Sequence, residues 1–167
     1  MIRSGTGPAL ALGLLLFGAG AHAQALPGIA VAQFDYADSS GEPGDQRALH
    51  ATRIAAFQEK LVGDLGSQDR YRPVKLECGQ GPCSAATENA DALIEAARKT
   101  GADYLVFGGV HKMSTLIEWA KAEVIDLHTG KLVFDQLLTF RGDSDEAWQR
   151  AESFLAQELA TAKLAAP

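Results

Sequence analysis

Hydrophobic and polar positions along the chain follow two periods, which predict three helices and five strands. Apolar residues recur at steps of three and four in three segments, at about 46–65, 89–100 and 143–159. Runs rich in β-branched and aromatic residues predict strands at about 28–36, 71–77, 103–112, 116–127 and 131–141. The order β-α-β-α-β-β-β-α indicates a single-domain α/β sandwich with a mixed sheet. The first three strands alternate with helices, which requires parallel crossover connections. The last three strands follow one another, which requires antiparallel hairpin pairs.

Helix ends are marked by residues that can satisfy free backbone groups. Asn89 is suited to cap the second helix, and Gly101 to end it. Asp143 with Glu146 three residues later forms a capping box, which predicts the start of the third helix. The tail from about residue 160 is expected to fray.

The first 23 residues have the pattern of an export signal. Arg3 gives a basic start, an apolar run of 14 residues spans 8–21, and Ala21-His22-Ala23 fits an A-x-A cleavage site. A membrane anchor is the alternative, but a spanning helix needs roughly 20 apolar residues. We therefore expect cleavage after Ala23, export to the periplasm and a mature domain over 24–167, with no transmembrane segment.

Composition and charge narrow the functional classes. A hydrophobic share of 47% with 22% charged residues is typical of a globular protein rather than a disordered one. The chain has 15 Lys and Arg against 21 Asp and Glu, a formal charge of -6. Because there is no basic block to neutralise phosphates, a nucleic-acid partner is not expected.

Two cysteines lie in a stretch rich in turn-forming residues. Cys78 and Cys83 are separated by four residues, which include Pro82. In an exported protein this favours a structural disulfide that fixes a loop. A metal site would need further ligands, and a thioredoxin-type redox pair has two intervening residues rather than four.

No pattern in the sequence indicates a catalytic centre or a cofactor. His50, His111 and His128 are far apart and lack metal-ligand spacing, and no G-x-S-x-G motif is present. One acidic group follows the first predicted strand and comprises Asp35, Asp38, Glu42 and Asp45. Ligands often bind beyond the ends of strands, so Asp35 and Asp38 are candidates for a cation or small-ligand site. A solvated, charged loop is the alternative.

Four apolar side chains are expected on one face of the sheet. Alternation places Trp119 and Ile125 on the same face of their strand, and Val133 and Leu137 on the same face of the next. If helices cover the opposite face, these four lie among charged residues. Either a further helix covers them, or they form a docking surface for another protein with Trp119 as its anchor.

Two segments resemble the TolB N-terminal-like superfamily. Gly101-Ala102-Asp103-Tyr104, followed by an apolar run to Val110, is similar to its GADY strand. The segment 124–131 resembles its L-I-D-x-x-T-G hairpin. This superfamily includes the curli secretion protein CsgG and lipoprotein activators of penicillin-binding proteins. The resemblance implies a periplasmic module that works by contact with envelope proteins.

The whole mature chain is also similar to a family of small exported bacterial proteins known only as a domain of unknown function. Counterparts there are the strand end Phe34-Asp35, the pair Arg141-Gly142 and the helix start Asp145-Glu146-x-Trp148. The shared positions are structural, so the resemblance implies no catalytic residue. The chain lacks the lipid-bearing cysteine of the lipoprotein members.

Three functions remain open from the sequence. The first is a non-enzymatic periplasmic accessory protein that contacts envelope proteins. The second is a periplasmic binder of a small ligand or cation, which would use the loop around Asp35 and Asp38. The third is a periplasmic enzyme or redox factor that uses Cys78 and Cys83.

Overall fold

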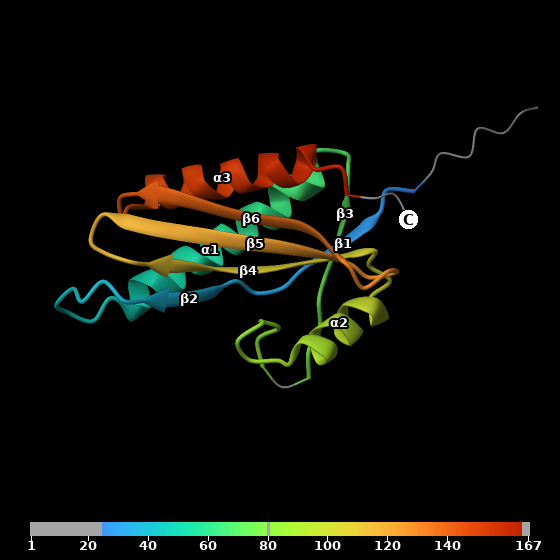
Figure 1. Cartoon of the computed structure of the whole chain (residues 1–167), viewed down its shortest axis with the longest axis horizontal. Coiled ribbons are helices and arrows are strands. Elements are labelled where there is room, and N and C mark those ends of the chain that lie inside the picture. Colours follow the sequence, from blue (N-terminus) through green and yellow to red (C-terminus); the bar gives the residue numbers. More distant parts are fainter. Residues whose placement is uncertain (1–24, 80, 165–167) are drawn as a thin grey trace, which may run out of the picture.

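The structure is a computed structural model, which describes residues 25–79 and 81–164 (Figure 1). The predicted export signal therefore lies outside the described residues. Within them, the chain forms one α/β domain in which three helices pack on a mixed sheet, as the sequence predicts. The elements in chain order are β1 (Gly28–Val31), β2 (Asp35–Asp38), α1 (Arg47–Ser67), β3 (Arg72–Val74), α2 (Ala90–Lys99), β4 (Tyr104–Lys112), β5 (Ile117–Asp126), β6 (Leu132–Arg141) and α3 (Asp145–Thr161).

The sheet runs in the order β3-β1-β4-β5-β6, and β2 also pairs with β4. The pairs that β1 forms with β3 and β4 are parallel, as is the pair of β2 with β4. The pairs β4–β5 and β5–β6 are antiparallel, which follows from their short hairpin connections. The mixed sheet inferred from the element order is thus confirmed.

One predicted strand is divided in two, which makes six strands instead of five. Val31 lies opposite Val106 on β4, whereas Asp35 lies opposite Gly109, so the first strand carries one residue more than β4 across this interval. At the break, the Gln33 amide donates to the Cys83 carbonyl at 2.7 Å instead of continuing the ladder. Residues 32–34 therefore form a bulge that ties the sheet to the cysteine loop.

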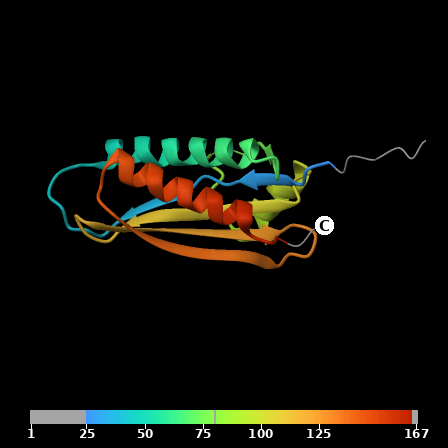
Figure 2. The same cartoon turned by 90° about the horizontal axis from the view of Figure 1, so that it is seen from above.

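Helices α1 and α3 lie side by side over one face of the sheet (Figure 2). Every third or fourth residue of each helix is buried there, as the sequence period predicts. The core beneath them contains Phe57, Leu61 and Leu65 from α1, Trp148, Leu155 and Leu159 from α3, and Val106, Val110, Ala120, Ala122 and Val124 from the strands.

Of the three described helices, only α2 lies on the other face of the sheet, near one end of β4 (Figure 1). Leu93 and Ala97 of α2 pack against Leu105 of β4 and Leu127. The Asn89 side chain accepts a hydrogen bond from the Ala92 amide at 2.8 Å, so the predicted cap is confirmed. With ten residues, α2 is too short to cover the whole of this face.

The residues shared with the TolB-like motifs have structural roles. Asp103 accepts a hydrogen bond from the Gly28 amide at 2.6 Å and so anchors the start of β1. Asp126 accepts bonds from the amides of His128 and Thr129, at 2.8 and 3.0 Å, and thereby holds the hairpin between β5 and β6. Gly130 completes this turn with a φ of 70°.

The third helix begins at a different cap from the one predicted. The Ser144 hydroxyl, not the Asp143 carboxylate, accepts the bond from the Ala147 amide, at 3.3 Å. Asp143 instead points into a buried ionic cluster. At the other end, α3 continues to Thr161, and Leu164 packs against the main core. Within the part of the chain that the structure describes, no helix is both long and apolar enough to cross a membrane.

The contact between β4 and β5 requires a glycine. A Cβ added at Gly108 would lie 2.0 Å from the Lys121 carbonyl oxygen. We predict that Gly108→Ala forces these strands apart and lowers the free energy of unfolding by about 3 kcal/mol or more, measured by chemical denaturation. Gly63→Ala in α1 is the control, since its Cβ meets open space, and should stabilise the chain by about 0.5–1 kcal/mol. Equal effects would contradict the packing described.

Candidate functional site

A cluster of charged residues is buried where α1, α3 and the ends of β4 and β5 meet. At its centre is Lys112, the last residue of β4, whose side chain is fully buried. Its ammonium donates to Asp143 at 2.6 Å and to the Gln46 side chain at 2.7 Å, and it is also bonded to Glu42. These three partners match the three N–H donors of a lysine, so its hydrogen-bonding capacity is filled.

Asp143 connects this lysine to both helices of the main layer. It lies in the loop between β6 and α3, and it also contacts His50 at 3.1 Å and Arg53 of α1. Arg53 in turn binds Asp145, in the first turn of α3, at 2.8 Å. Burial raises the pKa of Asp143. The hydrogen bonds and charges of Lys112, His50 and Arg53 lower it by more, so the pKa of Asp143 lies below its usual range.

Glu118 is the unusual member of the cluster. It lies directly opposite Lys112 on β5 and is only 1% exposed, yet neither of its carboxylate oxygens accepts a hydrogen bond within the described residues. Burial and the nearby Asp143 carboxylate raise the pKa of Glu118 to about 8. Glu118 is therefore protonated at neutral pH, and as a neutral acid it can donate a hydrogen bond to Asp143.

Three possible metal ligands come together in this cluster. His50, Glu118 and Asp143 each place a ligand atom within 4.8 Å of the other two. However, Lys112 and Arg53 already contact Asp143 and supply positive charge at this point. A metal ion would have to displace or approach these cations, so the cluster is better suited to hold a proton than a metal. Burial also leaves Lys112 and Glu118 out of reach of a substrate.

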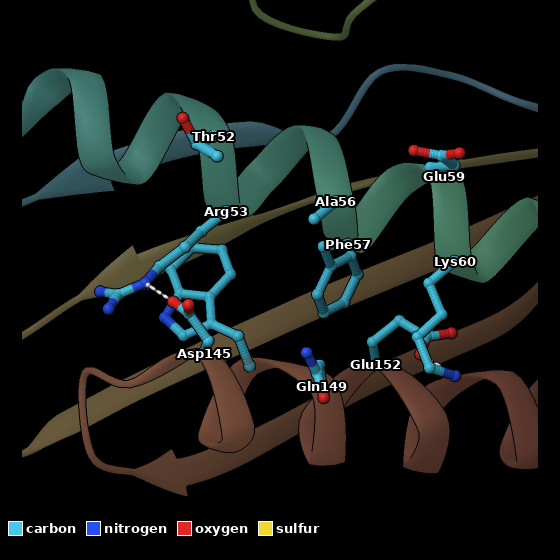
Figure 3. Close-up of a pocket in the computed structure, with 10 residues that line it drawn as sticks. Thr52, Arg53, Ala56, Phe57, Glu59, Lys60, Asp145, Gln149 and Glu152 are labelled. Atoms are coloured by element: carbon cyan, nitrogen blue, oxygen red, sulfur yellow. Dashed lines mark hydrogen bonds and ion pairs between the residues drawn. The ribbon is translucent and has the colours of Figure 1, made fainter.

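A groove of about 430 Å³ runs between α1 and α3 beside the cluster (Figure 3). Its apolar part is formed by Phe57 and Trp148. The ion pair of Arg53 with Asp145 lies at one end, and Lys60 binds the buried Glu152 at 2.8 Å toward the other. The cations that line this groove thus already have carboxylate partners.

The structure does not bring the two candidate cation ligands together. Asp35 and Asp38 lie opposite Gly109 and Lys112 of β4, which are on different faces of the sheet. Asp35 accepts a bond from the Ala86 amide at 3.0 Å, whereas Asp38 accepts one from the Ser40 amide at 2.8 Å. The other two acidic residues of this region are also engaged separately, Glu42 by Lys112 and Asp45 by Arg47.

Cys78 and Cys83 form a disulfide, as their setting predicts. Both residues pack against the smaller core beneath α2, and the Cys83 carbonyl holds the bulge after β1 through Gln33. The bridge therefore fixes the loop that joins β3 to α2. The other two histidines lie apart from the buried cluster. The His111 ring is hydrogen-bonded to the Ser39 hydroxyl at 2.8 Å, and the His128 ring to the Asp103 carboxylate at 2.8 Å.

Residues 25–79 and 81–164 cover only part of the sheet face opposite α1 and α3. We call its uncovered part the open face, formed by Ile117 and Trp119 of β5 with Leu137 of β6. Ile117 and Leu137 are 40% and 57% exposed, and Trp119 is half-buried against the His111 ring at a centroid distance of 4.9 Å. These side chains form an apolar surface supported by a rigid sheet.

The structure separates the four apolar residues expected on this face. Trp119 and Leu137 lie on it, but Ile125 packs against the core beneath α2. Val133 packs against the main core on the other side, because the pairing of β5 with β6 shifts by one residue at Ile125. Ile117 was not among the residues predicted for this face, although it lies two residues before Trp119 on the same strand and therefore on the same face.

Comparison with known proteins identifies the fold. Residues 27–159 match the family DUF3280, described as "Protein of unknown function (DUF2380)", and no curated protein matches the chain. The hypothetical protein CT253 from Chlamydia trachomatis is 12% identical with a TM-score of 0.58, over 83% of this chain and 98% of that chain. TolB from Acinetobacter baumannii is also 12% identical, with a TM-score of 0.52, over 83% of this chain and 28% of that chain. The predicted TolB-like fold is thus confirmed.

The ion pairs of Lys112 should contribute far more to stability than a surface pair. We predict that Lys112→Met lowers the free energy of unfolding by about 3–5 kcal/mol, because it removes the buried ammonium that Asp143 and Glu42 share. Lys121→Met removes the exposed pairs with Glu123 and Asp135 and should cost less than about 1 kcal/mol. Urea denaturation measures both, and similar losses would contradict the central position of Lys112.

Glu118 should make stability depend on pH. Its folded pKa of about 8 exceeds the ordinary value of 4.5, so its neutral form stabilises the fold. This stability is complete below pH 4.5 and is lost as the pH rises to about 8, by about 1.4 kcal/mol per pH unit within that window.

The matched variant Glu118→Gln stays neutral at every pH. We therefore expect its stability relative to the parent to increase between pH 5 and 8 and to level off above pH 8. Chemical denaturation across this range measures the difference, in which the titrations of other groups cancel. A constant difference would show that Glu118 has the same charge in the folded and unfolded states, and so that folding does not raise its pKa.

Proposed function

Because this chain belongs to the family DUF3280, whose function is unknown, we propose from its structure that it is a non-enzymatic accessory protein of the periplasm. It acts by contact with envelope proteins, and the open face is its contact surface. The observation that carries this proposal is the unequal cover of the sheet: two long helices lie on one face and one short helix on the other.

The open face has the properties of a protein contact surface. Ile117 and Leu137 expose apolar side chains on adjacent strands, and Trp119 lies between them on the same face. Lys121, with Glu123 and Asp135, provides a charged border on this face. An apolar centre that contains an aromatic side chain, with a polar rim, is typical of protein interfaces.

The expected location rests on two features. The N-terminal sequence has the pattern of a cleavable export signal, and the cysteine pair forms a disulfide, which persists in oxidising compartments. The similarity to TolB supports the fold and, by analogy alone, a role among envelope proteins.

The ionic cluster supports a structural rather than an enzymatic role for the charged residues. Lys112 and Asp143 bind partners within the chain, and Glu118 and Lys112 are buried. A catalytic group must reach a substrate directly or through a water molecule. These side chains join helices to the sheet instead.

Site-specific photo-crosslinking in the native host tests the proposed surface. A photoreactive amino acid at Ile117 should form an adduct with a defined envelope protein, identified by mass spectrometry. Phe154 is the matched control, since it is also apolar and 45% exposed but lies on α3, on the other side of the sheet. We expect no such adduct from position 154.

A second substitution connects the adduct to the open face. Leu137→Glu places a charge there without filling a buried space, so it should abolish the adduct from position 117 while leaving the melting temperature unchanged. Phe154→Glu should leave the adduct intact. The same adducts from both positions, or no effect of Leu137→Glu, would contradict the proposal.

A further inference from the structure

The two edges of the sheet differ in how far they are protected. One edge is formed by short strands: β3 has only three residues and contains Pro73, and β2, which pairs with β4 beyond the end of β1, has only four. The other edge is β6, which has ten residues, contains no proline, and pairs only with β5 among the described strands. A long edge strand without such protection is a template for pairing with another strand.

The hydrogen bonds to β5 determine which groups of β6 point outward. The Gly142 amide donates to the Leu116 carbonyl at 3.1 Å, and the register is regular from Ile117 to Val124. Because bonded and non-bonded residues alternate in an antiparallel pair, the even-numbered residues from 134 to 140 bond to β5. The amide and carbonyl groups of Asp135, Leu137, Thr139 and Arg141 are therefore directed to the free edge.

The side chains at these outward positions are complementary to themselves. If a second β6 pairs antiparallel with a two-fold axis at Leu138, Asp135 lies opposite Arg141 of the partner subunit, and Leu137 lies opposite Thr139 of the partner subunit. Opposite charges that face each other across strands are favourable. Within the described residues, Arg141 has no ion pair, and the contact of Asp135 with Lys121 is long, at 3.6 Å.

We propose that two copies of this chain associate through their β6 edges, in the antiparallel register that pairs Asp135 with Arg141. The two-fold symmetry forms each of these ion pairs twice. Its axis is perpendicular to the sheet, so the helical layers of both copies lie on one side and the two open faces join on the other. The dimer thus doubles the surface assigned to envelope proteins, although its formation does not depend on that assignment.

Charge exchange at the two positions tests the register. Analytical ultracentrifugation of the mature chain should show a concentration-dependent dimer. Asp135→Arg and Arg141→Asp each place like charges opposite each other twice, so each variant should dimerise at least about tenfold more weakly. Both residues are exposed, so the variants should fold, which thermal melting checks.

Mixing the variants separates this register from a general effect of charge. Asp135→Arg and Arg141→Asp together should form a heterodimer, since opposite charges then face each other at both contacts, one in the parent direction and one reversed. The double variant Asp135→Arg/Arg141→Asp should also dimerise as the parent does. If the mixture stays monomeric, or if the single variants associate as strongly as the parent, the proposed register is wrong.

Amide hydrogen exchange gives a measurement that requires no substitution. Leu137 and Thr139 amides should become protected as the protein concentration rises, because they bond only in the dimer. Gln136 and Leu138 amides should be protected at every concentration, because they bond to β5. A parent protein that remains monomeric at millimolar concentration, with Leu137 and Thr139 amides unprotected throughout, would overturn the proposal.

Discussion

The buried ammonium of Lys112 joins α1 and α3 to the end of the sheet. Its bonds reach Asp143, before α3, as well as Glu42 and Gln46, before α1. Asp143 in turn binds His50 and Arg53, so one carboxylate connects both helices to the end of the sheet. Because an unpaired charge would be costly at this depth, the helices have a single favourable position over the sheet. The glycines of β4 and the core beneath the helices complete that arrangement.

With both long helices fixed on one face, the described chain has only α2 and the disulfide loop to cover the other face. Ten residues of α2 and the disulfide loop cover one end of this face and leave Ile117, Trp119 and Leu137 uncovered. On the far side of β6 no described strand continues the sheet, so β6 is a long free edge. The proposed contact with envelope proteins and the proposed pairing of two copies therefore come from one property of the fold, which is a sheet larger than the helices that cover it.

The sequence predicted the elements well because hydrophobic period and turn chemistry are local. Ile54, Phe57 and Leu61 indicated the buried side of α1, and Asn89 marked the start of α2. The buried ionic cluster was missed because its members are up to 101 residues apart, from Glu42 to Asp143. One signal was available: Glu118 shares the core-facing parity of Ala120, which is unusual for a carboxylate. Asp143 was assigned to a local cap because Glu146 follows it three residues later, but the neighbouring Ser144 takes that role in the structure.

Methyl NMR of the labelled mature protein in periplasmic extract tests the role of the open face most directly. Ile117 and Leu137 report on that face, and Leu49 of α1, which is 46% exposed, reports on the opposite layer. The account predicts that the Ile117 and Leu137 signals shift or broaden in a saturable manner while the Leu49 signal keeps its position and width. A change at Leu49 without one at Ile117 and Leu137 would show that the partner binds elsewhere and would contradict the account.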